Sequence, residues 1–569
     1  MPLTAGGVSQ SPELTNFALR PPEKVMRLDR MGSSFPTRLS FMRSLIRRMS
    51  REGWSFDRLR FEVDDDGYGV SIYAAHTTER TYSLVVFTNE LDPQERSDRV
   101  IAEAWDATFS LFDGIPSVED TERLRANTPK QEAGRFCPSE LVLARANKSL
   151  RLFEHVVSSL AQGRQPDLKL LASVGYLMRT TAVYGSGKFG CADREKISGR
   201  KETMGAFQVE MLCVYLIRWF TIDLVEHIAR CQGGSFAVPL APEPRRFLGI
   251  GNATGLGMAP FLINHPVLIH KWVSARETAL ARVGSLESVS SETIEKFTKL
   301  VDRAIKHVEE WKVEDKLQKA RITRLREDLE SLIKWTREDG NLHQQFPWES
   351  LYSFAHTNFS LEGQELAVSL MLEPHGELVD DLSDHMHSSY ELRLNPAMSV
   401  ECLKELIEER YGWALGIDFE DPEAQRHFWY YSEEKLEPRF GNREVDPGEE
   451  HEMPLAVGRD VSLLFSILNK VSAEETVGEF VIDRPEFRHI VRRVQSLVGF
   501  PYAEIRDNLV GDGMRPLDLL RFKLAFFGAS KFDPKSDLWT RITMFQGAPL
   551  PEELDEYDPD DWAFPVQPS

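Results

Sequence analysis

The chain has 569 residues, of which 42% are hydrophobic and 28% are charged, and its 68 Lys and Arg against 89 Asp and Glu give a net charge of −21. This composition is typical of a globular protein and excludes a disordered, collagen-like or coiled-coil chain, and the length predicts about three or four structural units. The negative charge argues against a nucleic-acid-binding protein, because affinity for phosphates needs a basic face.

The cysteines and the apolar segments indicate where the protein resides. Its five cysteines include no C-x-x-C pair, which argues against a disulfide framework or a structural zinc site and favours a reducing compartment. The first residues lack the basic and apolar regions of a signal peptide. The most apolar long segment, residues 211–225, contains Arg218 and Asp223 and is shorter than the ~20 residues of a membrane span. We therefore expect a cytoplasmic protein without a membrane span.

The N-terminal part predicts an arm followed by a small domain. Residues 1–36 are rich in Ser, Pro and Gly and predict a flexible arm. Residues 37–50 predict a basic amphipathic helix, which could dock on a membrane or an acidic partner, or pack on acidic parts of its own chain, the interpretation we favour. Three β-rich runs in residues 58–90 predict an antiparallel meander, and residues 96–112 predict a helix. Residues 37–135 are thus expected to form a small α+β domain.

The middle of the chain has a mainly helical pattern. Residues 136–345 are expected to form a helical domain, with helices at 139–160 and 167–181 and a central, nearly all-apolar helix at 202–230. Residues 291–335 have apolar side chains at helical spacing in a highly charged segment, which predicts a long amphipathic helix or a helical hairpin. Its apolar face could form the seam of a homodimer or pack within the chain.

The C-terminal part mixes both types of pattern. Residues 346–546 are expected to form an α+β domain with strands at 365–374 and 389–396 and a helix from residue 400. Residues 547–569 predict a solvated acidic tail. The fold class that follows is α+β and predominantly helical, with a central helical domain flanked by small antiparallel sheets.

A first Gly-rich segment, residues 184–190, reads Tyr-Gly-Ser-Gly-Lys-Phe-Gly. Glycines around a Ser and a Lys can turn their backbone N–H groups towards an anion, with Lys188 as the counter-charge. The P-loop template does not fit, because Ala182 and Phe189 stand where it needs Gly and a Mg²⁺-binding hydroxyl, and because the preceding residues read as helical. We predict an anion-binding loop with Tyr184 as a catalytic group and with Ser186, Lys188, Arg194 and Lys201 as anion ligands.

A second Gly-rich segment spans residues 249–257, and its glycines have the G-x-x-x-G-x-G spacing of short-chain dehydrogenases. Prolines on both sides and the helical pattern that follows argue against the βαβ unit and the parallel sheet that this family needs. The segment then predicts either a turn of backbone amides that leads into a helix near Pro260, or a Gly-rich crossing of two helices. The predicted ligand-binding residues are Asn252, Thr254 and Lys271, and the predicted proton carriers are His265 and His270.

A third cluster, His375, His385 and His387 with nearby carboxylates, lies in an expected acidic loop. His-x-His with a carboxylate can bind Zn²⁺, Mn²⁺ or Fe²⁺, but the spacing is loose and such a loop is usually solvated, so we predict no metal site.

Taken together, these residues predict an enzyme that acts on a small anionic metabolite, a carboxylate or a phosphate. The two Gly-rich segments would converge on one pocket, which suits a lyase, an isomerase or a transferase. The cofactor is undetermined, since amide turns also bind the pyrophosphate of a flavin or a nucleotide. The alternative is a non-catalytic interaction or scaffold protein that uses the basic N-terminal helix and the acidic C-terminal tail as partner surfaces.

Overall fold

The structure is a computed structural model. It describes residues 17–35, 37–92, 104–128, 139–184, 204, 207–254, 266–338, 340–387, 393–419, 421, 429–432, 438–440, 452–454, 457–504, 516–529, 531–533, 540–556, 558–565 and 567.

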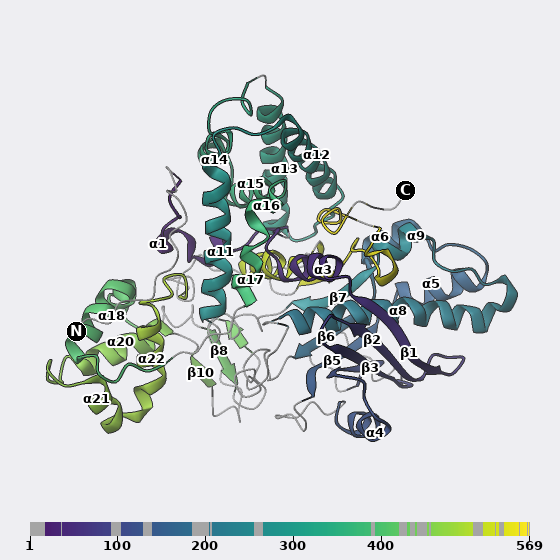
Figure 1. Cartoon of the computed structure of the whole chain (residues 1–569), viewed down its shortest axis with the longest axis horizontal. Helices are drawn as coiled ribbons and strands as arrows, with labels where there is room; N and C mark the ends of the chain where they lie inside the picture. Colours follow the sequence, from purple (N-terminus) through teal and green to yellow (C-terminus); the bar gives the residue numbers. More distant parts are fainter. Residues whose placement is uncertain are drawn as a thin grey trace.

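A large curled sheet occupies the lower right of Figure 1. Its described strands are hydrogen-bonded in the order β1 (Ser55–Val63), β2 (Gly69–His76), β3 (Thr81–Thr88), β4 (Ala107–Asp113), β5 (Glu140–Lys148), β6 (Tyr176–Tyr184), β7 (Gly249–Thr254), β12 (Thr540–Met544) and β11 (Lys531–Asp533). Neighbouring strands are antiparallel, except for the parallel pair β6 and β7. The predicted meander is confirmed as β1–β3, and β4 and β5 extend it.

Both faces of the sheet are covered around β2 and β3. Successive side chains of a strand point to opposite faces, so Tyr73 and Leu84 join the main core while Ile72 and Val85 join a smaller cluster. Helix α4 (Val118–Asn127) closes that smaller cluster with Leu124. Burial on both faces explains why β2 and β3 are apolar along nearly their whole length.

Helix α8 (Gln208–Gly233) packs across the main-core face of the sheet, and it confirms the central buried helix predicted at 202–230. Arg218 in its middle is 1% exposed and donates hydrogen bonds to the carbonyl oxygens of Leu248, Arg246 and Pro549. The cation thereby ties the helix to the start of β7 and to the C-terminal segment. Within the described part of the chain, this helix and all others are too short or too polar to cross a membrane.

A layer of long helices stands above the sheet in Figure 1 and consists of α11 (Pro266–Gly284), α12 (Ser291–Glu309), α13 (Lys316–Arg337), α14 (Pro347–Asn358) and α15 (Leu361–Leu372). The hairpin of α12 and α13 fits the alternative predicted for residues 291–335. The apolar face of α12 is covered within the chain, because Phe297 packs edge-on against Trp348 and Val301 is fully buried. This packing leaves the idea of a dimer seam without support.

The remaining elements are a C-terminal helical group and a set of short helices, turns and strands. A C-terminal helical group contains α18 (Val400–Leu415), α20 (Val457–Leu468), α21 (Val477–Asp483) and α22 (Arg488–Ser496), at the lower left of Figure 1. The other described elements are α1 (Pro22–Val25), α2 (Leu28–Met31), α3 (Phe41–Arg51), α5 (Leu152–Ala161), α6 (Leu168–Val174), α9 (Pro242–Phe247), α16 (Gly376–Val379), α17 (Leu382–His387), α23 (Pro516–Lys523) with the π-helical turn η3 (Leu524–Gly528), three single 3₁₀ turns, η1 (Gly234–Phe236), η2 (Pro485–Phe487) and η4 (Pro551–Glu553), and a small sheet of β8 (Trp429–Ser432), β9 (Pro438–Phe440) and β10 (Glu452–Pro454).

The predicted architecture of a central helical domain flanked by small sheets is wrong. The fold is α+β and mostly helical, but its sheet is large and draws β5, β6 and β7 from residues 136–345 and β11 and β12 from residues 346–546. The predicted helices at 96–112, 139–160 and 167–181 each end in or begin with a strand in the described residues. The strand expected at 365–374 lies largely in α15. Short apolar runs that are buried on all sides have no readable period, which accounts for these errors.

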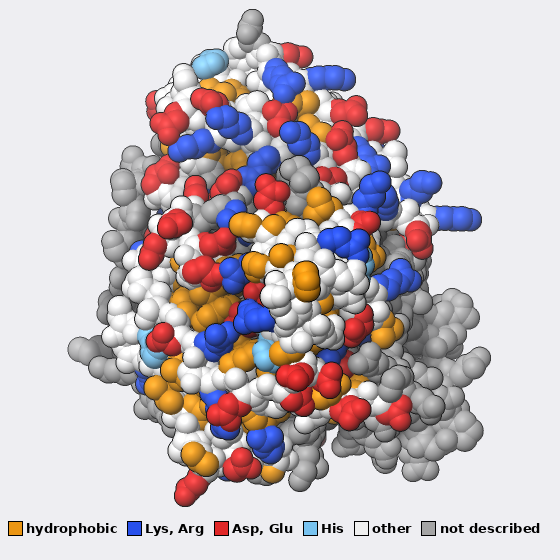
Figure 2. All heavy atoms as spheres, turned by 90° about the vertical axis from the view of Figure 1, so that its right-hand side faces the viewer, with side chains coloured by type: hydrophobic (Ala, Val, Ile, Leu, Met, Phe, Trp, Pro, Cys, Tyr) orange, Lys and Arg blue, Asp and Glu red, His pale blue; other side chains and the backbone are white. Residues whose placement is uncertain are grey.

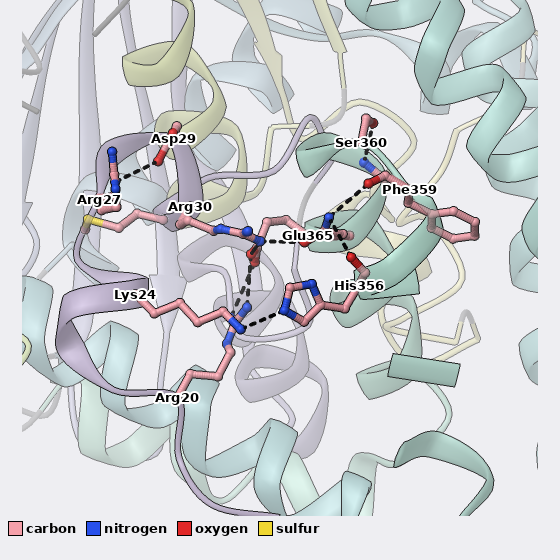
Figure 3. Close-up of polar contacts among 12 residues, drawn as sticks. Arg20, Lys24, Arg27, Asp29, Arg30, His356, Phe359, Ser360 and Glu365 are labelled. Atoms are coloured by element: carbon pink, nitrogen blue, oxygen red, sulfur yellow. Dashed lines mark hydrogen bonds and ion pairs between the residues drawn. The ribbon is translucent and has the colours of Figure 1, made fainter. Parts of the chain in front are cut away.

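The segment before α3 is firmly packed from residue 17 onwards, in contrast to the predicted flexible arm. Arg20 donates to both Glu277 of α11 and Glu365 of α15, and Arg30 also contacts Glu365 (Figure 3). Burial disfavours the charged form of Glu365, yet the neighbouring arginines, first of all Arg20, outweigh it and lower the pKa of this carboxyl. Apolar residues between the arginines, such as Phe35, are fully buried. These buried arginines and apolar residues were not recognised in the sequence, because the segment is rich in Ser, Pro and Gly.

The C-terminal segment is not a solvated tail either. Trp562 and Phe564 are buried, and the ring of Phe564 lies 5.1 Å from that of Phe35. Its acids bind arginines of the same chain: Glu553 pairs with Arg246, Glu552 with Arg245 and Asp561 with Arg303. On the face of the molecule shown in Figure 2, Lys and Arg side chains alternate with Asp and Glu, which fits charges that pair locally.

Candidate functional site

The parallel strands β6 and β7 are joined through helix α8 and form a βαβ unit, although the residues before the first Gly-rich segment were predicted to be helical. Thr180 of β6 is in register with Asn252 of β7, so both strands run towards the same edge of the sheet. Their last residues are Tyr184, where the first Gly-rich segment begins, and Thr254, which lies within the second. Ligands of parallel sheets bind at the carboxyl ends of the strands, and a Gly-rich segment between a strand and a helix is a typical anion site.

Among the predicted ligand-binding residues, Asn252 has described hydrogen-bond partners for both its amide nitrogen and its amide oxygen. It is 8% exposed, and its Nδ2 donates to Thr180 Oγ1 over 2.8 Å. The Thr180 hydroxyl in turn donates to the carbonyl oxygen of Gly251 over 3.1 Å. These two bonds fix the orientation of the amide, so that its Oδ1 is the acceptor that faces the site.

Lys523 supplies the donor to that oxygen. Its Nζ lies 2.5 Å from Asn252 Oδ1 and 6.0 Å from the centre of the Phe527 ring. Lys523 is the last residue of α23 and directly precedes η3, and π-helical turns are frequent at functional sites. No carboxylate among the described residues forms an ion pair with this ammonium, and burial lowers its pKa to about 8. A buried lysine with a neutral partner is a candidate functional group.

The described residues that follow the two Gly-rich segments also pack around η3. Phe207, directly before α8, contacts the rings of Phe526 and Phe527 at 5.7 and 5.5 Å. Trp272 of α11 contacts Phe522 and Phe526 at 5.4 and 5.3 Å. Phe207 and helix α11, which follow the two segments in the chain, therefore both pack beside the turn that follows Lys523.

The start of α8 adds a feature that suits an anion. Phe207 stands at its N-cap position with φ of 60°, a left-handed conformation rare for a bulky residue, and provides no side-chain cap. The first N–H groups of a helix lack intrahelical partners, and the helix dipole favours negative charge there. Glu210 in the same turn is 2% exposed and already has a polar interaction.

Half of the predicted site residues fall outside the described part of the chain, as does the helix start expected near Pro260. They are Ser186, Lys188, Arg194, Lys201 and His265. Tyr184 and Thr254 are described as the final residues of their strands. The convergence of the two segments stays a prediction, now anchored by the positions of their described ends.

His270 and Lys271 lie on the second turn of α11. His270 Nδ1 accepts the backbone N–H of Tyr502 at 3.0 Å, and the imidazole packs on the rings of Phe500 and Tyr502. Burial, aided by the charge of Lys271, lowers the pKa of His270 to about 4. The imidazole is therefore neutral at pH 7, with one nitrogen already used, so we do not carry it forward as the proton carrier. Burial also lowers the pKa of Lys271.

The glycines that begin the second segment lie in a strand and not in the predicted turn. A Cβ on Gly251 would lie 2.8 Å from the ring of Tyr176, and one on Gly249 would lie 2.4 Å from the carbonyl oxygen of Met544. Glycine is needed here because neighbouring groups approach the strand closely. The sequence alternative for this segment was a Gly-rich crossing of two helices. The glycines do allow close packing, but between strands of the sheet.

We expect Gly251→Ala to lower the free energy of unfolding by about 1–3 kcal/mol, because the added methyl group must displace the Tyr176 ring in a packed interior. Gly412→Ala is the matched control, since it lies in helix α18 with nothing within 4 Å of the new Cβ. It should be neutral or stabilising by up to ~1 kcal/mol. Urea unfolding of both variants measures the difference, and equal stability of the two would contradict the packing role.

The predicted acidic loop at residues 373–387 is largely helical and contains α16 and α17. His375 is buried with its ring edge-on to Trp348, and burial lowers its pKa. The described residues contain no group of three or more His, Cys, Asp or Glu side chains placed to hold a metal ion.

A hollow with a volume of about 250 Å³ lies beside α3. Arg47, Arg48 and Arg51 line it together with Asp380, Asp384 and Asp560. Arg47 Nη1 lies 2.8 Å from Asp560 Oδ1, and Arg48 Nε lies 2.9 Å from Glu52 Oε1, so these cations are neutralised within the chain. This pairing confirms that the basic helix packs on acidic parts of its own chain, and it makes the hollow a weaker anion site than the β6–β7 edge.

Lys523 was missed because no motif surrounds it and because 271 positions separate it from Asn252. The available signal was the presence of two cations, Arg521 and Lys523, within the otherwise apolar run Leu519–Phe527, because a charge in apolar surroundings is costly.

No family model, no curated protein and no solved structure matches this chain.

Proposed function

We propose that this protein is a cytoplasmic enzyme that acts on a small anionic metabolite at the carboxyl edge of β6 and β7, with Lys523 at its centre. The observation that carries the proposal is the Lys523–Asn252 pair, placed where both Gly-rich segments leave the sheet. The uncapped start of α8 and the predicted cations Lys188, Arg194 and Lys201 add positive potential to an otherwise acidic protein.

The chemistry follows from the two forms of Lys523. With a pKa of about 8, most molecules carry the ammonium at pH 7, and it can bind a carboxylate or phosphate by a charge-assisted hydrogen bond. A substantial minority carry the neutral amine, which can accept a proton or attack an electrophile. A lyase, an isomerase or a transferase needs such a group. Asn252, held by Thr180, keeps the nitrogen in place in both forms.

The alternative of an interaction protein has less support. It requires a free basic helix and a free acidic tail as partner surfaces. Asp560 of the C-terminal segment instead forms ion pairs with Arg43 and Arg47 of α3 and also with Arg38. The basic helix and the acidic segment therefore bind each other within the chain.

Calorimetry with inorganic phosphate and with pyruvate tests the proposal. We expect at least one anion to bind the wild-type protein, and we expect Lys523→Met and Lys188→Ala each to weaken that binding by about 1.5–3 kcal/mol, the usual size of a charge-assisted hydrogen bond. Lys299→Ala is the control, because that lysine is exposed and pairs only with Glu295 on its own helix. Equal affinity in all four proteins would contradict the assignment of the site.

A further inference from the structure

We infer that Lys523 forms a covalent imine with the carbonyl carbon of a small anionic aldehyde or ketone, of which a 2-oxo acid is the simplest kind. The inference rests on the proposed function, because it uses the same site and names its substrate class. The Nζ lone pair attacks the carbonyl carbon, the resulting carbinolamine loses water, and a C=N bond replaces the C=O bond. Water reverses the step, and no oxidant or reductant is needed.

The first observation is the chemical nature of the partner of Lys523. The buried cations Arg20, Arg43 and Arg521 each contact a carboxylate, which holds their positive charge. Lys523 donates instead to the amide oxygen of Asn252, which is neutral and takes no proton. An amine that must lose its proton to react is better served by such a partner than by a carboxylate.

The second observation is the way the lysine is held. Arg521, two residues earlier, donates to the carbonyl oxygens of Asp29 and Gly32, and Phe522 packs on Trp272. The backbone at Lys523 is thereby fixed, and the residue as a whole is half-buried. A fixed backbone keeps the amine in one place for repeated attack on a small substrate.

The third observation concerns the population of the reactive form. The pKa of about 8 makes roughly a quarter of the Lys523 amines neutral at pH 7.5, against about one in a thousand for an ordinary lysine. Burial beside the apolar residues of η3 maintains this difference, since it disfavours the ammonium. The anionic end of the substrate would lie towards the start of α8.

Reductive trapping tests the inference. The full-length protein is incubated at pH 7.5 with glyoxylate, the smallest anionic aldehyde, and sodium cyanoborohydride, which converts an imine into a stable carboxymethyl amine. Peptide mass spectrometry then locates the adducts. We expect Lys523 to be modified at least tenfold faster than the exposed Lys299, because burial keeps a larger share of the Lys523 amine neutral. Modification of Lys523 no faster than Lys299 would overturn the inference.

Two variants sharpen the result. Asn252→Asp places a carboxylate beside Nζ, stabilises the ammonium, and should slow trapping at Lys523 by about tenfold or more at pH 7.5, with recovery at higher pH. Lys299→Arg is the control, because Lys299 is exposed and pairs with Glu295 on its own helix, and it should leave trapping at Lys523 unchanged. Unaltered trapping in Asn252→Asp would contradict the role of the neutral partner.

The trapping and the calorimetry have outcomes that distinguish failure of the imine from failure of the anion site. Lys523-dependent binding of pyruvate without any trapped adduct would refute the imine and leave the proposed anion site standing. Absence of both Lys523-dependent binding and trapping in a protein with native circular dichroism would refute both.

Discussion

Replacing Arg43 with methionine is expected to lower the free energy of unfolding by about 3–5 kcal/mol, the cost of leaving a buried charge without its partner. Arg43 is fully buried in α3, and its two terminal nitrogens donate to both carboxylate oxygens of Glu373 and to Asp560. Burial disfavours the charged form of Asp560, but Arg47, Arg43 and Arg38 together outweigh it and lower the pKa of this carboxyl below its ordinary range. The substitution breaks a network that joins the N-terminal segment, α15 and the C-terminal segment.

Arg51→Met on the same helix is the matched control. Its side chain is 61% exposed and lies 3.9 Å from Glu52, so its removal should change stability little. Adding Glu373→Leu to Arg43→Met should recover much of the loss, because the stranded carboxylate is then gone. Urea unfolding of the four proteins provides the comparison. A loss in Arg43→Met no larger than in Arg51→Met would show that the network does not hold the termini in place.

Replacing Lys523 with methionine is expected to have the opposite effect at neutral pH and to stabilise the protein. The pKa of Lys523 falls from 10.5 to about 8 on folding, so protonating the folded form at pH 7 costs about 2–3 kcal/mol after allowance for partial exposure. The unfolded chain binds this proton between pH 8 and pH 10.5 and the folded chain does not. Wild-type stability relative to the variant therefore rises by that amount across this window.

Unfolding of both proteins at pH 7 and pH 10 measures the change, and other titrating groups cancel in the difference. Lys299→Met serves as the control, because Lys299 is exposed and forms a surface ion pair on its own helix, so its loss should change stability little. A constant difference between wild type and Lys523→Met would mean that Lys523 has an ordinary pKa. Stabilisation by loss of a functional group is the usual trade between activity and stability.

The sequence predicted those helices and strands whose spacing of apolar residues matches the faces that they bury. The amphipathic α3, the α12–α13 hairpin and the β1–β3 meander each face apolar groups on one side or alternate regularly between two clusters, and the structure contains all three. It failed for strands buried on both faces. In β5 the apolar and small residues run together, so period alone could not separate strand from helix.

The site was predictable only in part, for a related reason. Asn252 was found through its Gly-rich neighbours, whereas Lys523 belongs to the site through tertiary contact across the sheet. The βαβ unit was not predicted because the residues of β6 were assigned to a helix, and it is this unit that brings Tyr184 and Thr254 to one edge of the sheet. The glycine pattern identified the two Gly-rich segments in the sequence. Their proximity follows from the pairing of β6 with β7, which the sequence pattern did not reveal.

The central claim is that Lys523 is a buried amine poised for chemistry, and a direct titration of its Nζ tests that claim most directly. Heteronuclear NMR of protein labelled at lysine follows each ammonium signal with pH, and Lys523→Arg identifies the signal of Lys523. We predict that this signal titrates near pH 8, well below the pKa of about 10.4 of an unperturbed lysine. Titration of Lys523 together with the exposed lysines would contradict the account and leave Lys523 as a structural residue.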